Sequence, residues 1–151
     1  MRNVDEKYMK LALDEAMQAL AEGEVPIGCV IVKDGEVIGC GHNRVEELKD
    51  ASAHAEILAI RKASGAVENW RLNGATAYVT VEPCPMCASA LIFSRVERIV
   101  FGAKNPHFGA CGTIWNLPDE PAFENHPIIC EGIMVDVAEK LMRTFFDIIK
   151  Q

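Results

Sequence analysis

Residues 75–93 read ATAYVTVEPCPMCASALIF. The first part of this stretch is rich in residues that favour β-strands, and Pro83 interrupts that pattern directly before a run that predicts a helix from about Cys84 to Phe93. Pro85 suits the first turn of such a helix, where a missing backbone N–H costs nothing. The stretch therefore predicts a strand followed at once by a helix, which is the repeating unit of an α/β protein.

Elements of the same two kinds extend outward on both sides of this unit. The sequence predicts helices at 4–22, 53–63 (ended by Gly65) and 135–149, strands at 27–33, 36–41 and 98–103, a strand or extended edge at 128–133, an Asp34-Gly35 hairpin turn, and loops at 43–52 and 105–124. Strands that alternate with helices predict a sheet covered by helices on both faces. The first strand pair is expected to be antiparallel and the later strands parallel.

Length and composition favour one domain that covers residues 1–151. Half of the residues are hydrophobic and a quarter are charged, which is enough to bury a core in a chain of this size. The sequence contains no internal repeat and no long linker. It also contains no apolar run of the roughly 18–20 residues that a membrane span needs, and its start lacks the features of a secretory signal. A cytoplasmic location is therefore expected.

The charge balance limits the kinds of partner. The formal net charge is −7 and the sequence has no basic run. Proteins that bind nucleic acid in bulk usually carry a basic face that releases counterions from the phosphates. Any contact of this chain with nucleic acid is therefore expected to be local and modest.

The Cys84–Cys87 pair is the first sign of a chemical site. A spacing of three at the start of a helix puts both sulfur atoms on one face, near the positive end of the helix dipole, which favours thiolate over thiol. Such a pair serves either redox chemistry or zinc binding. His54, predicted at the start of another helix, supplies an imidazole, and one imidazole with two thiolates is a three-ligand zinc set.

A three-ligand set leaves the fourth tetrahedral position of zinc for water, whose pKa falls to about 7 on the metal. The other cysteines and His42 lie far away in sequence and form no close pair, which favours this open site over a closed structural one. Glu56, two residues after His54, is placed to move protons beside such a water without binding the metal. Taken alone, Glu56 is equally compatible with a surface glutamate in the first turn of a helix.

The joint pattern H-x-E followed about thirty residues later by P-C-x-x-C is more specific than either half. It is the signature of zinc deaminases that act on adenine or cytosine. Further stretches carry a resemblance to one family: GEVPIG (23–28), GHNR (41–44), AHAEI (53–57), PCPMC (83–87), RIVFGA (98–103), GACGT (109–113) and FF (145–146). With these motifs the chain resembles, over nearly its whole length, the bacterial tRNA-specific adenosine deaminases of the cytidine/deoxycytidylate deaminase-like superfamily.

That resemblance implies a fold, a reaction and an assembly. The implied fold is the three-layer α/β/α sandwich of the cytidine deaminase type, with helices on both faces of a central mixed five-stranded sheet. The implied reaction is the zinc-dependent hydrolytic conversion of adenosine to inosine at the wobble position (34) of a tRNA anticodon loop. One Zn²⁺ per chain and a homodimer are implied as well.

The resemblance also implies a role for each matching residue. Zinc would be bound by His54, Cys84 and Cys87, Glu56 would be the proton shuttle, Asn43 would hydrogen-bond the flipped nucleoside, the backbones of Ala55 and Pro83 would line the base pocket, and Ile27 would pack against the ring. From its position alone, Asn43 is equally a turn residue before a loop.

Departures from the family concern the RNA contacts and keep other functions open. The last helix continues as DIIKQ without the usual basic residues, and His107-Phe108 stand where a lysine is common. Deamination of a free base or nucleoside such as guanine or cytosine suits the acidic surface better. A module with a structural zinc and no activity is the third interpretation, and Glu56→Ala would leave every deaminase assay unchanged in that case.

Overall fold

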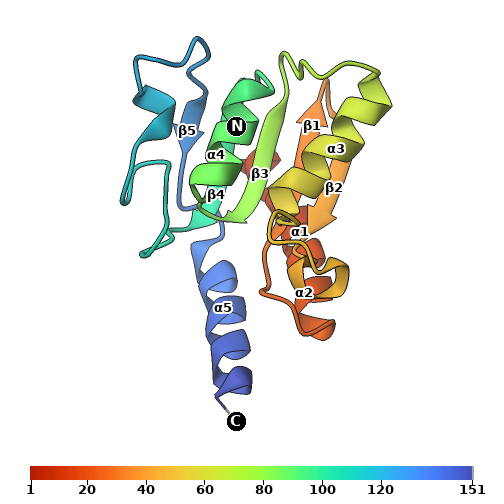
Figure 1. Cartoon of the computed structure of the whole chain (residues 1–151), viewed down its shortest axis with the longest axis vertical. Coiled ribbons are helices and arrows are strands. Elements are labelled where there is room, and N and C mark those ends of the chain that lie inside the picture. The colour runs from red at the N-terminus through yellow and green to blue at the C-terminus, as the bar shows by residue number, and fades with distance from the viewer. Residues whose placement is uncertain (151) are drawn as a thin grey trace.

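Five strands form one mixed sheet in the order β2-β1-β3-β4-β5 (Figure 1). Its strands are β1 (Gly28–Lys33), β2 (Glu36–His42), β3 (Thr76–Val81), β4 (Arg98–Ala103) and β5 (Ile128–Cys130). The strand β1 pairs antiparallel with both β2 and β3, whereas β3, β4 and β5 run parallel to one another. The computed structural model, which describes residues 1–150, thus confirms the predicted mixed five-stranded sheet.

The hairpin between β1 and β2 follows the predicted turn. Asp34 and Gly35 have φ angles of 52° and 75°. A two-residue hairpin loop with positive φ at both positions matches the right-handed twist of the two strands that it joins. This short loop is what keeps β1 and β2 antiparallel neighbours.

Helices cover both faces of the sheet and give the molecule three layers. The helices α1 (Arg2–Ala21) and α5 (Val135–Ile149) lie on one face, and α3 (Ala55–Val67) and α4 (Pro85–Phe93) lie on the other. Figure 1 shows that α5 runs away from the sheet, so that its last turns project from the body. The three-layer α/β/α fold is therefore as predicted.

Each face of the sheet has its own apolar core because side chains alternate along a strand. On the α3/α4 face, Cys29, Val79 and Phe101 are register neighbours and are fully buried. On the α1/α5 face, Val30 and Tyr78 pack against α1 in a second cluster. Because the central strands are covered on both sides, they appear in the sequence as nearly continuous apolar runs.

Glycine residues let the helices approach the sheet closely. A Cβ atom on Gly28 would lie 2.0 Å from the Ala12 carbonyl oxygen of α1, and one on Gly39 would lie 2.4 Å from the Ala59 carbonyl oxygen of α3. Neither space can accept a methyl group. These two contacts fix the distance of α1 and α3 from the sheet.

Three details differ from the expectation. The loop predicted at 43–52 contains a short helix, α2 (Val45–Leu48), and the loop at 105–124 contains a 3₁₀ helix, η1 (Leu117–Asp119). Gly65 does not end α3, because the helix continues to Val67 and ends where Glu68 adopts a left-handed φ of 55°. The predicted last strand is short, since only Ile128–Cys130 pair with β4.

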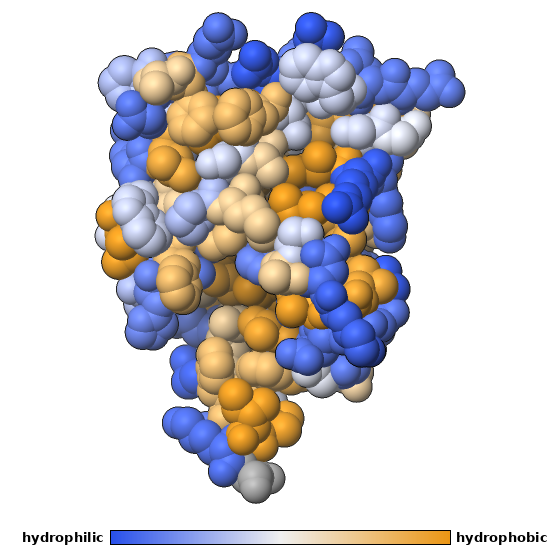
Figure 2. Space-filling view, viewed as in Figure 1, coloured by the Kyte–Doolittle hydropathy of each residue, from blue (hydrophilic) through white to orange (hydrophobic). Residues whose placement is uncertain are grey.

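Figure 2 shows hydrophilic residues around the margins of this face, and hydrophobic residues over its centre and along one side of the projecting α5. Exposed apolar residues of this helix are Val137, Phe146, Ile148 and Ile149. Among residues 1–150, every helix is too short or too polar to cross a membrane.

Candidate metal centre and active site

Two helices begin at the same edge of the sheet and bring the predicted metal ligands together. His54 is the residue that precedes the first turn of α3, and Cys84 occupies the same place before α4. Both have extended backbone angles, which is typical of this position. Pro85 begins α4 as predicted, and Cys87 follows one turn into it. The helix starts, not the strands, therefore position the three side chains.

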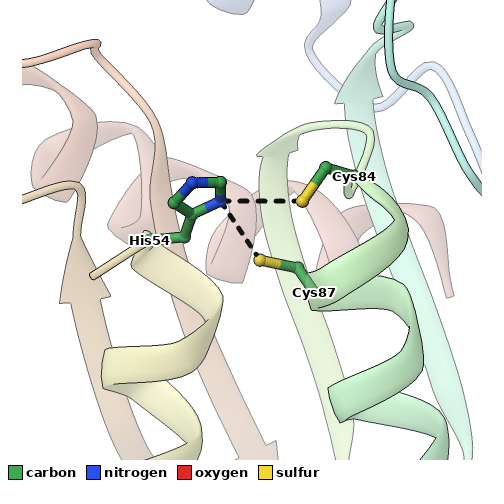
Figure 3. A group of neighbouring side chains, drawn as sticks. All are labelled: His54, Cys84 and Cys87. Atoms are coloured by element: carbon green, nitrogen blue, oxygen red, sulfur yellow. Dashed lines mark hydrogen bonds between the residues drawn. The ribbon is translucent and has the colours of Figure 1, made fainter. Parts of the chain in front are cut away.

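The three side chains form the one cluster of at least three candidate ligands found among residues 1–150. Nδ1 of His54 lies 3.6 Å from Sγ of Cys84 and 3.4 Å from Sγ of Cys87 (Figure 3). All three atoms lie within 4.8 Å of one another. In a tetrahedral zinc site with ordinary Zn–S and Zn–N bonds, nitrogen and sulfur ligands lie about 3.6 Å apart. The spacing therefore fits zinc without rearrangement.

The protonation of the cysteine pair also fits a cation. A hydrogen bond from Cys87, aided by His54, lowers the pKa of Cys84 to about 4. The same hydrogen bond to Cys84, together with burial, raises the pKa of Cys87. The two thiols thus share one proton, and a divalent cation between the sulfur atoms stabilises both thiolates in its place.

Glu56 lies beside this cluster but is not one of its ligands. Its side chain is 4% exposed, and burial raises the pKa of its carboxyl group to about 7. A carboxyl group that exchanges its proton near neutral pH is suited to general acid–base work. Within the described part of the chain no fourth side chain joins the cluster, so a zinc ion held by these three residues would keep one coordination position for water or substrate.

A cavity of about 660 Å³ opens beside the cluster. Its wall includes six of the predicted site residues, which are Ile27, Asn43, His54, Ala55, Glu56 and Cys84. Cys87 is buried and does not contribute to the wall. Pro83 is not a lining residue either, and its carbonyl oxygen accepts a hydrogen bond from the Ala110 N–H at 2.9 Å. The predicted role of Pro83 in the base pocket therefore stays a prediction.

Sequence reasoning missed part of the wall. Phe145 and Ile149 reach the cavity from α5, far along the chain from the metal cluster. In the sequence, Phe145 belongs to one of the motifs that carry the family resemblance. The pattern of an amphipathic helix does not indicate which of its residues faces a cavity. Their position follows from the packing of α5 against α1 and β4.

Glu82 is a further residue that sequence reasoning missed. It is 2% exposed and directly precedes the Pro83-Cys84 pair. Its carboxylate accepts hydrogen bonds from the backbone N–H groups of Cys111 at 2.9 Å, Thr113 at 3.1 Å and Asn105 at 3.2 Å. These hydrogen bonds hold the loop that follows β4 against the metal cluster. The available signal was a charged residue at the end of an otherwise apolar strand.

Comparisons with known proteins agree with this geometry. The family model of the cytidine and deoxycytidylate deaminase zinc-binding region matches residues 2–103, which include all three candidate ligands and Glu56. The tRNA-specific adenosine deaminase of Bacillus subtilis (strain 168) is 47% identical over 94% of this chain and 88% of its own length. The enzyme of the same name from Aquifex aeolicus (strain VF5) is 45% identical over 93% of each chain.

A solved structure from a study of A-to-I editing by tRNA:A34 deaminases at the wobble position of transfer RNA superimposes with a TM-score of 0.87. It is 42% identical in sequence, and the match covers 89% of this chain and 98% of that one. Fold, metal cluster and sequence thus lead to one conclusion. The chain belongs to the zinc-binding cytidine and deoxycytidylate deaminase family, and within it to the group of the tRNA-specific adenosine deaminases.

Proposed function

We propose that this protein is a zinc-dependent hydrolase that converts adenosine to inosine at the wobble position (34) of a tRNA anticodon loop. One observation carries the proposal, namely that a three-ligand metal cluster and the buried Glu56 carboxyl meet at the wall of one cavity. A closed structural zinc site would need a fourth ligand, and its role would not require a cavity beside the metal.

The residues of the cluster have distinct proposed roles. His54, Cys84 and Cys87 would hold the zinc ion, which when bound supplies a Lewis acid that makes water nucleophilic at neutral pH. Glu56 takes one proton from the attacking water and delivers it to the adenine ring nitrogen. It then transfers the second proton of that water, from the hydroxyl now on C6, to the departing amino group as the C–N bond breaks. Water and adenosine are thereby converted to inosine and ammonia, and the carboxyl group returns to its starting state.

The lining residues would bind the target nucleoside. Ile27 offers an apolar surface to the base, Asn43 offers hydrogen bonds, and the Ala55 backbone lines the same cavity. The contribution of the Pro83 backbone to this pocket rests on the family resemblance alone. An enzyme of this kind must take the target base out of its stack. A tRNA anticodon loop presents unstacked bases, so this step costs little there.

Few basic residues are available to hold the RNA backbone. The candidates are Lys104, His107, Lys140, Arg143 and Lys150. Each phosphate contact made by a protein adds to the dependence of binding on salt. With a net charge of −7, this protein is expected to lose affinity for RNA only gradually as the salt concentration rises.

The proposal is tested with an anticodon stem-loop that carries adenosine at the wobble position. Sequencing detects inosine in the RNA, and ammonia release is measured in parallel with free adenosine, cytidine, guanine and cytosine. We expect the stem-loop to react far faster than any free compound. Preference for a free base or nucleoside would refute the tRNA proposal and leave a deaminase, whereas no reaction with any compound would indicate a structural zinc module.

We also propose that the protein forms a homodimer and resides in the cytoplasm, where its RNA substrate occurs. Met86 and Phe93 of α4 are exposed on a helix that is apolar on all sides, and Phe108, Ile114 and Trp115 are exposed on the loop that follows β4. A helix that is apolar all round is normally buried. Light scattering should give twice the chain mass, and a monomeric mass at working concentration would contradict the dimer.

A further inference from the structure

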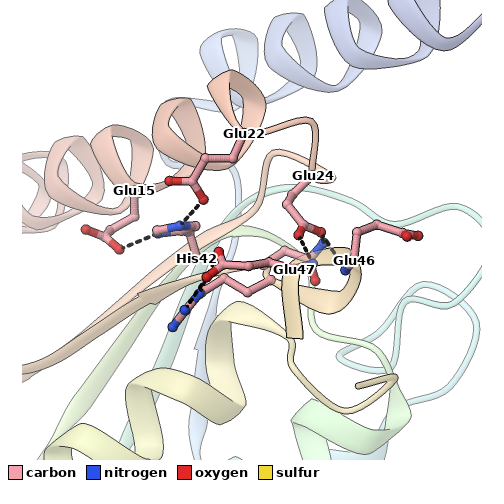
Figure 4. A network of polar contacts seen from close by, with 8 residues as sticks. Glu15, Glu22, Glu24, His42, Glu46 and Glu47 are labelled. Atoms are coloured by element: carbon pink, nitrogen blue, oxygen red, sulfur yellow. Dashed lines mark hydrogen bonds and ion pairs between the residues drawn. The ribbon is translucent and has the colours of Figure 1, made fainter. Parts of the chain in front are cut away.

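Glu24 is a buried carboxylate between α1 and β1 that the mechanism above does not use. Its side chain is 2% exposed. One oxygen, Oε1, accepts a hydrogen bond from the Glu46 N–H at 3.1 Å and from Nδ2 of Asn43 at 3.4 Å. The other, Oε2, accepts from the Glu47 N–H at 2.8 Å (Figure 4). Three donors thus hold this carboxylate in one position.

Glu24 takes the place of the missing cap of α2. Arg44, which precedes the first turn of this helix, makes no side-chain capping bond. The N–H groups of the second and third helical residues, normally bound by such a cap, are instead bound by Glu24. Because Val45 and Glu46 line the cavity, Glu24 fixes one part of the cavity wall.

Glu24 also decides which way the Asn43 amide faces. Asn43 is 7% exposed, and its backbone N–H donates to the Ile27 carbonyl oxygen at 3.2 Å. An ionised carboxylate only accepts hydrogen bonds, so the amide must turn its nitrogen toward Glu24. Its oxygen, Oδ1, receives no hydrogen bond from residues 1–150 and is left as an acceptor for a ligand of the cavity that Asn43 lines.

The chemistry of the proposed substrate identifies the group that meets this acceptor. An adenosine inside an RNA strand has two kinds of conventional hydrogen-bond donor, the 6-amino group and the ribose 2′-hydroxyl. The amino group leaves in the reaction and must face the metal cluster. The 2′-hydroxyl, which distinguishes RNA from DNA, is the remaining donor.

We propose that Glu24 is a positioning residue that orients Asn43 so that Oδ1 accepts a hydrogen bond from the 2′-hydroxyl of the target nucleoside. The identity of the substrate in this statement rests on the proposed function. The orientation of Asn43 by Glu24 rests on the hydrogen bonds alone and is tested separately.

The first experiment exchanges the two partners. Asn43→Asp places two carboxylates side by side in a buried site, and Glu24→Gln replaces one accepting oxygen with an NH2 group that meets N–H donors in either orientation of the amide. The double variant Glu24→Gln/Asn43→Asp restores a donor–acceptor pair between residues 24 and 43 with reversed polarity and removes the repulsion between two carboxylates, although the Glu46 N–H loses its acceptor. Thermal unfolding should show that the double variant is more stable than Asn43→Asp alone. Additive losses of stability would overturn the orientation of Asn43 by Glu24, whatever the substrate is.

The second experiment measures kinetics on two stem-loops, one with adenosine and one with 2′-deoxyadenosine at the wobble position. Glu24→Gln should lower kcat/KM for adenosine by about 10- to 100-fold, as loss of a residue that supports a binding group usually does. The loss for 2′-deoxyadenosine should be much smaller. Asn43→Ala should show the same pattern, and Glu24→Gln should add little to it.

Glu47→Gln is the matched control because Glu47 is on the same helix, but its side chain pairs with Arg44 on the surface. It should leave both substrates unaffected, and zinc content should stay the same in every variant. Equal losses for the two stem-loops would overturn the 2′-hydroxyl contact. If the wild-type protein acts on neither stem-loop, the proposed function is wrong, and the thermal unfolding series still decides the role of Glu24.

Discussion

At the residue scale, the proposed mechanism assigns zinc binding to three side chains and proton transfer to a fourth, Glu56. Three side chains face a common point with the spacing of a zinc tetrahedron, and the neighbouring carboxyl group stays outside that set. Because these are separate tasks, substitutions should separate zinc binding from catalysis.

Glu56→Gln should keep the metal and lose the reaction. The substitution preserves volume and removes the group that takes up and releases the proton. Loss of general acid–base catalysis costs about 10²–10⁴ in rate, so kcat should fall within that range. Elemental analysis should still find one zinc ion per chain. A variant with full activity would show that another residue moves the proton.

Cys87→Ser should lose both zinc and activity, because the hydroxyl group of serine does not ionise as the thiolate of a zinc ligand must. Cys130→Ser is the matched control, since Cys130 is partly buried on β5 and does not belong to the metal cluster. Zinc content per chain is the measurement. Equal zinc contents in the two variants would contradict the assignment of Cys87 as a ligand.

At the element scale, the sequence predicted those parts of the structure that local patterns determine. Local patterns predicted the starts of α3 and α4 to within two residues, and spacing along the sequence pointed to the three candidate ligands and to Glu56. The helix α2 was missed because its cap, Glu24, comes from a distant part of the chain. Contacts of this kind, and the arrival of α5 at the cavity, are tertiary and leave no periodic signal in the sequence.

The position of the first turns of α3 should be sensitive to substitutions in β2, against which they pack. A Cβ atom on Gly41 would lie 2.8 Å from the Ala55 carbonyl oxygen and 3.0 Å from the Ala59 nitrogen. Gly41→Ala should therefore displace the turn that carries the metal ligand and Glu56, and overpacking of this kind costs about 1–3 kcal/mol. We expect weaker zinc binding in a chelator competition.

Gly65→Ala provides the contrast within the same helix, because a Cβ atom there meets nothing within 4 Å. It should stabilise the protein by up to about 1 kcal/mol, the difference in helix propensity between the two residues, and leave zinc affinity unchanged. If Gly41→Ala had no more effect on zinc affinity than Gly65→Ala, close packing would not position the ligand.

A buried ion pair joins α1 to the sheet. Arg98 of β4 donates to both carboxylate oxygens of Asp5 at 3.2 and 3.0 Å, and the Tyr78 hydroxyl donates to one of them at 2.8 Å. Burial opposes the ionisation of Asp5, but the hydrogen bonds from Arg98 and Tyr78 outweigh it and lower the pKa of Asp5 below 3.8. The ion pair therefore stabilises the fold above this pH and ceases to do so as the pH falls through the pKa of Asp5 in the folded protein.

Arg98→Met should destabilise the protein by about 3–5 kcal/mol near pH 7, because it leaves the Asp5 carboxylate buried without its partner. In the variant, burial raises the pKa of Asp5, so protonation relieves the cost as the pH falls. Urea unfolding near pH 7 and near pH 4 should show a difference from wild type that shrinks with acid. A constant difference would mean that lost packing, and not lost charge pairing, causes the effect.

At the scale of the whole molecule, the cavity is assembled from the full length of the chain. The segment after α1, the starts of α2 and α3, the end of β3 and the last turns of α5 each contribute part of its wall. The signature formed by the H-x-E and P-C-x-x-C motifs contains only His54, Ala55, Glu56 and Cys84 of these lining residues. Specificity for a particular nucleoside therefore depends on parts of the fold that the signature does not contain.

The position of the metal ligands has a mechanical consequence. His54 and Cys84 are 30 residues apart and precede two helices that pack on the same face of the sheet. A zinc ion that joins them would link the two helix starts, and because the unfolded chain lacks this preformed site, the free energy of zinc binding adds to the stability of the folded protein. Chelation should therefore lower the melting temperature, by about 2–4 °C for each kcal/mol of binding free energy that is lost. A protein built in this way depends on the supply of zinc for its lifetime in the cell as well as for its activity.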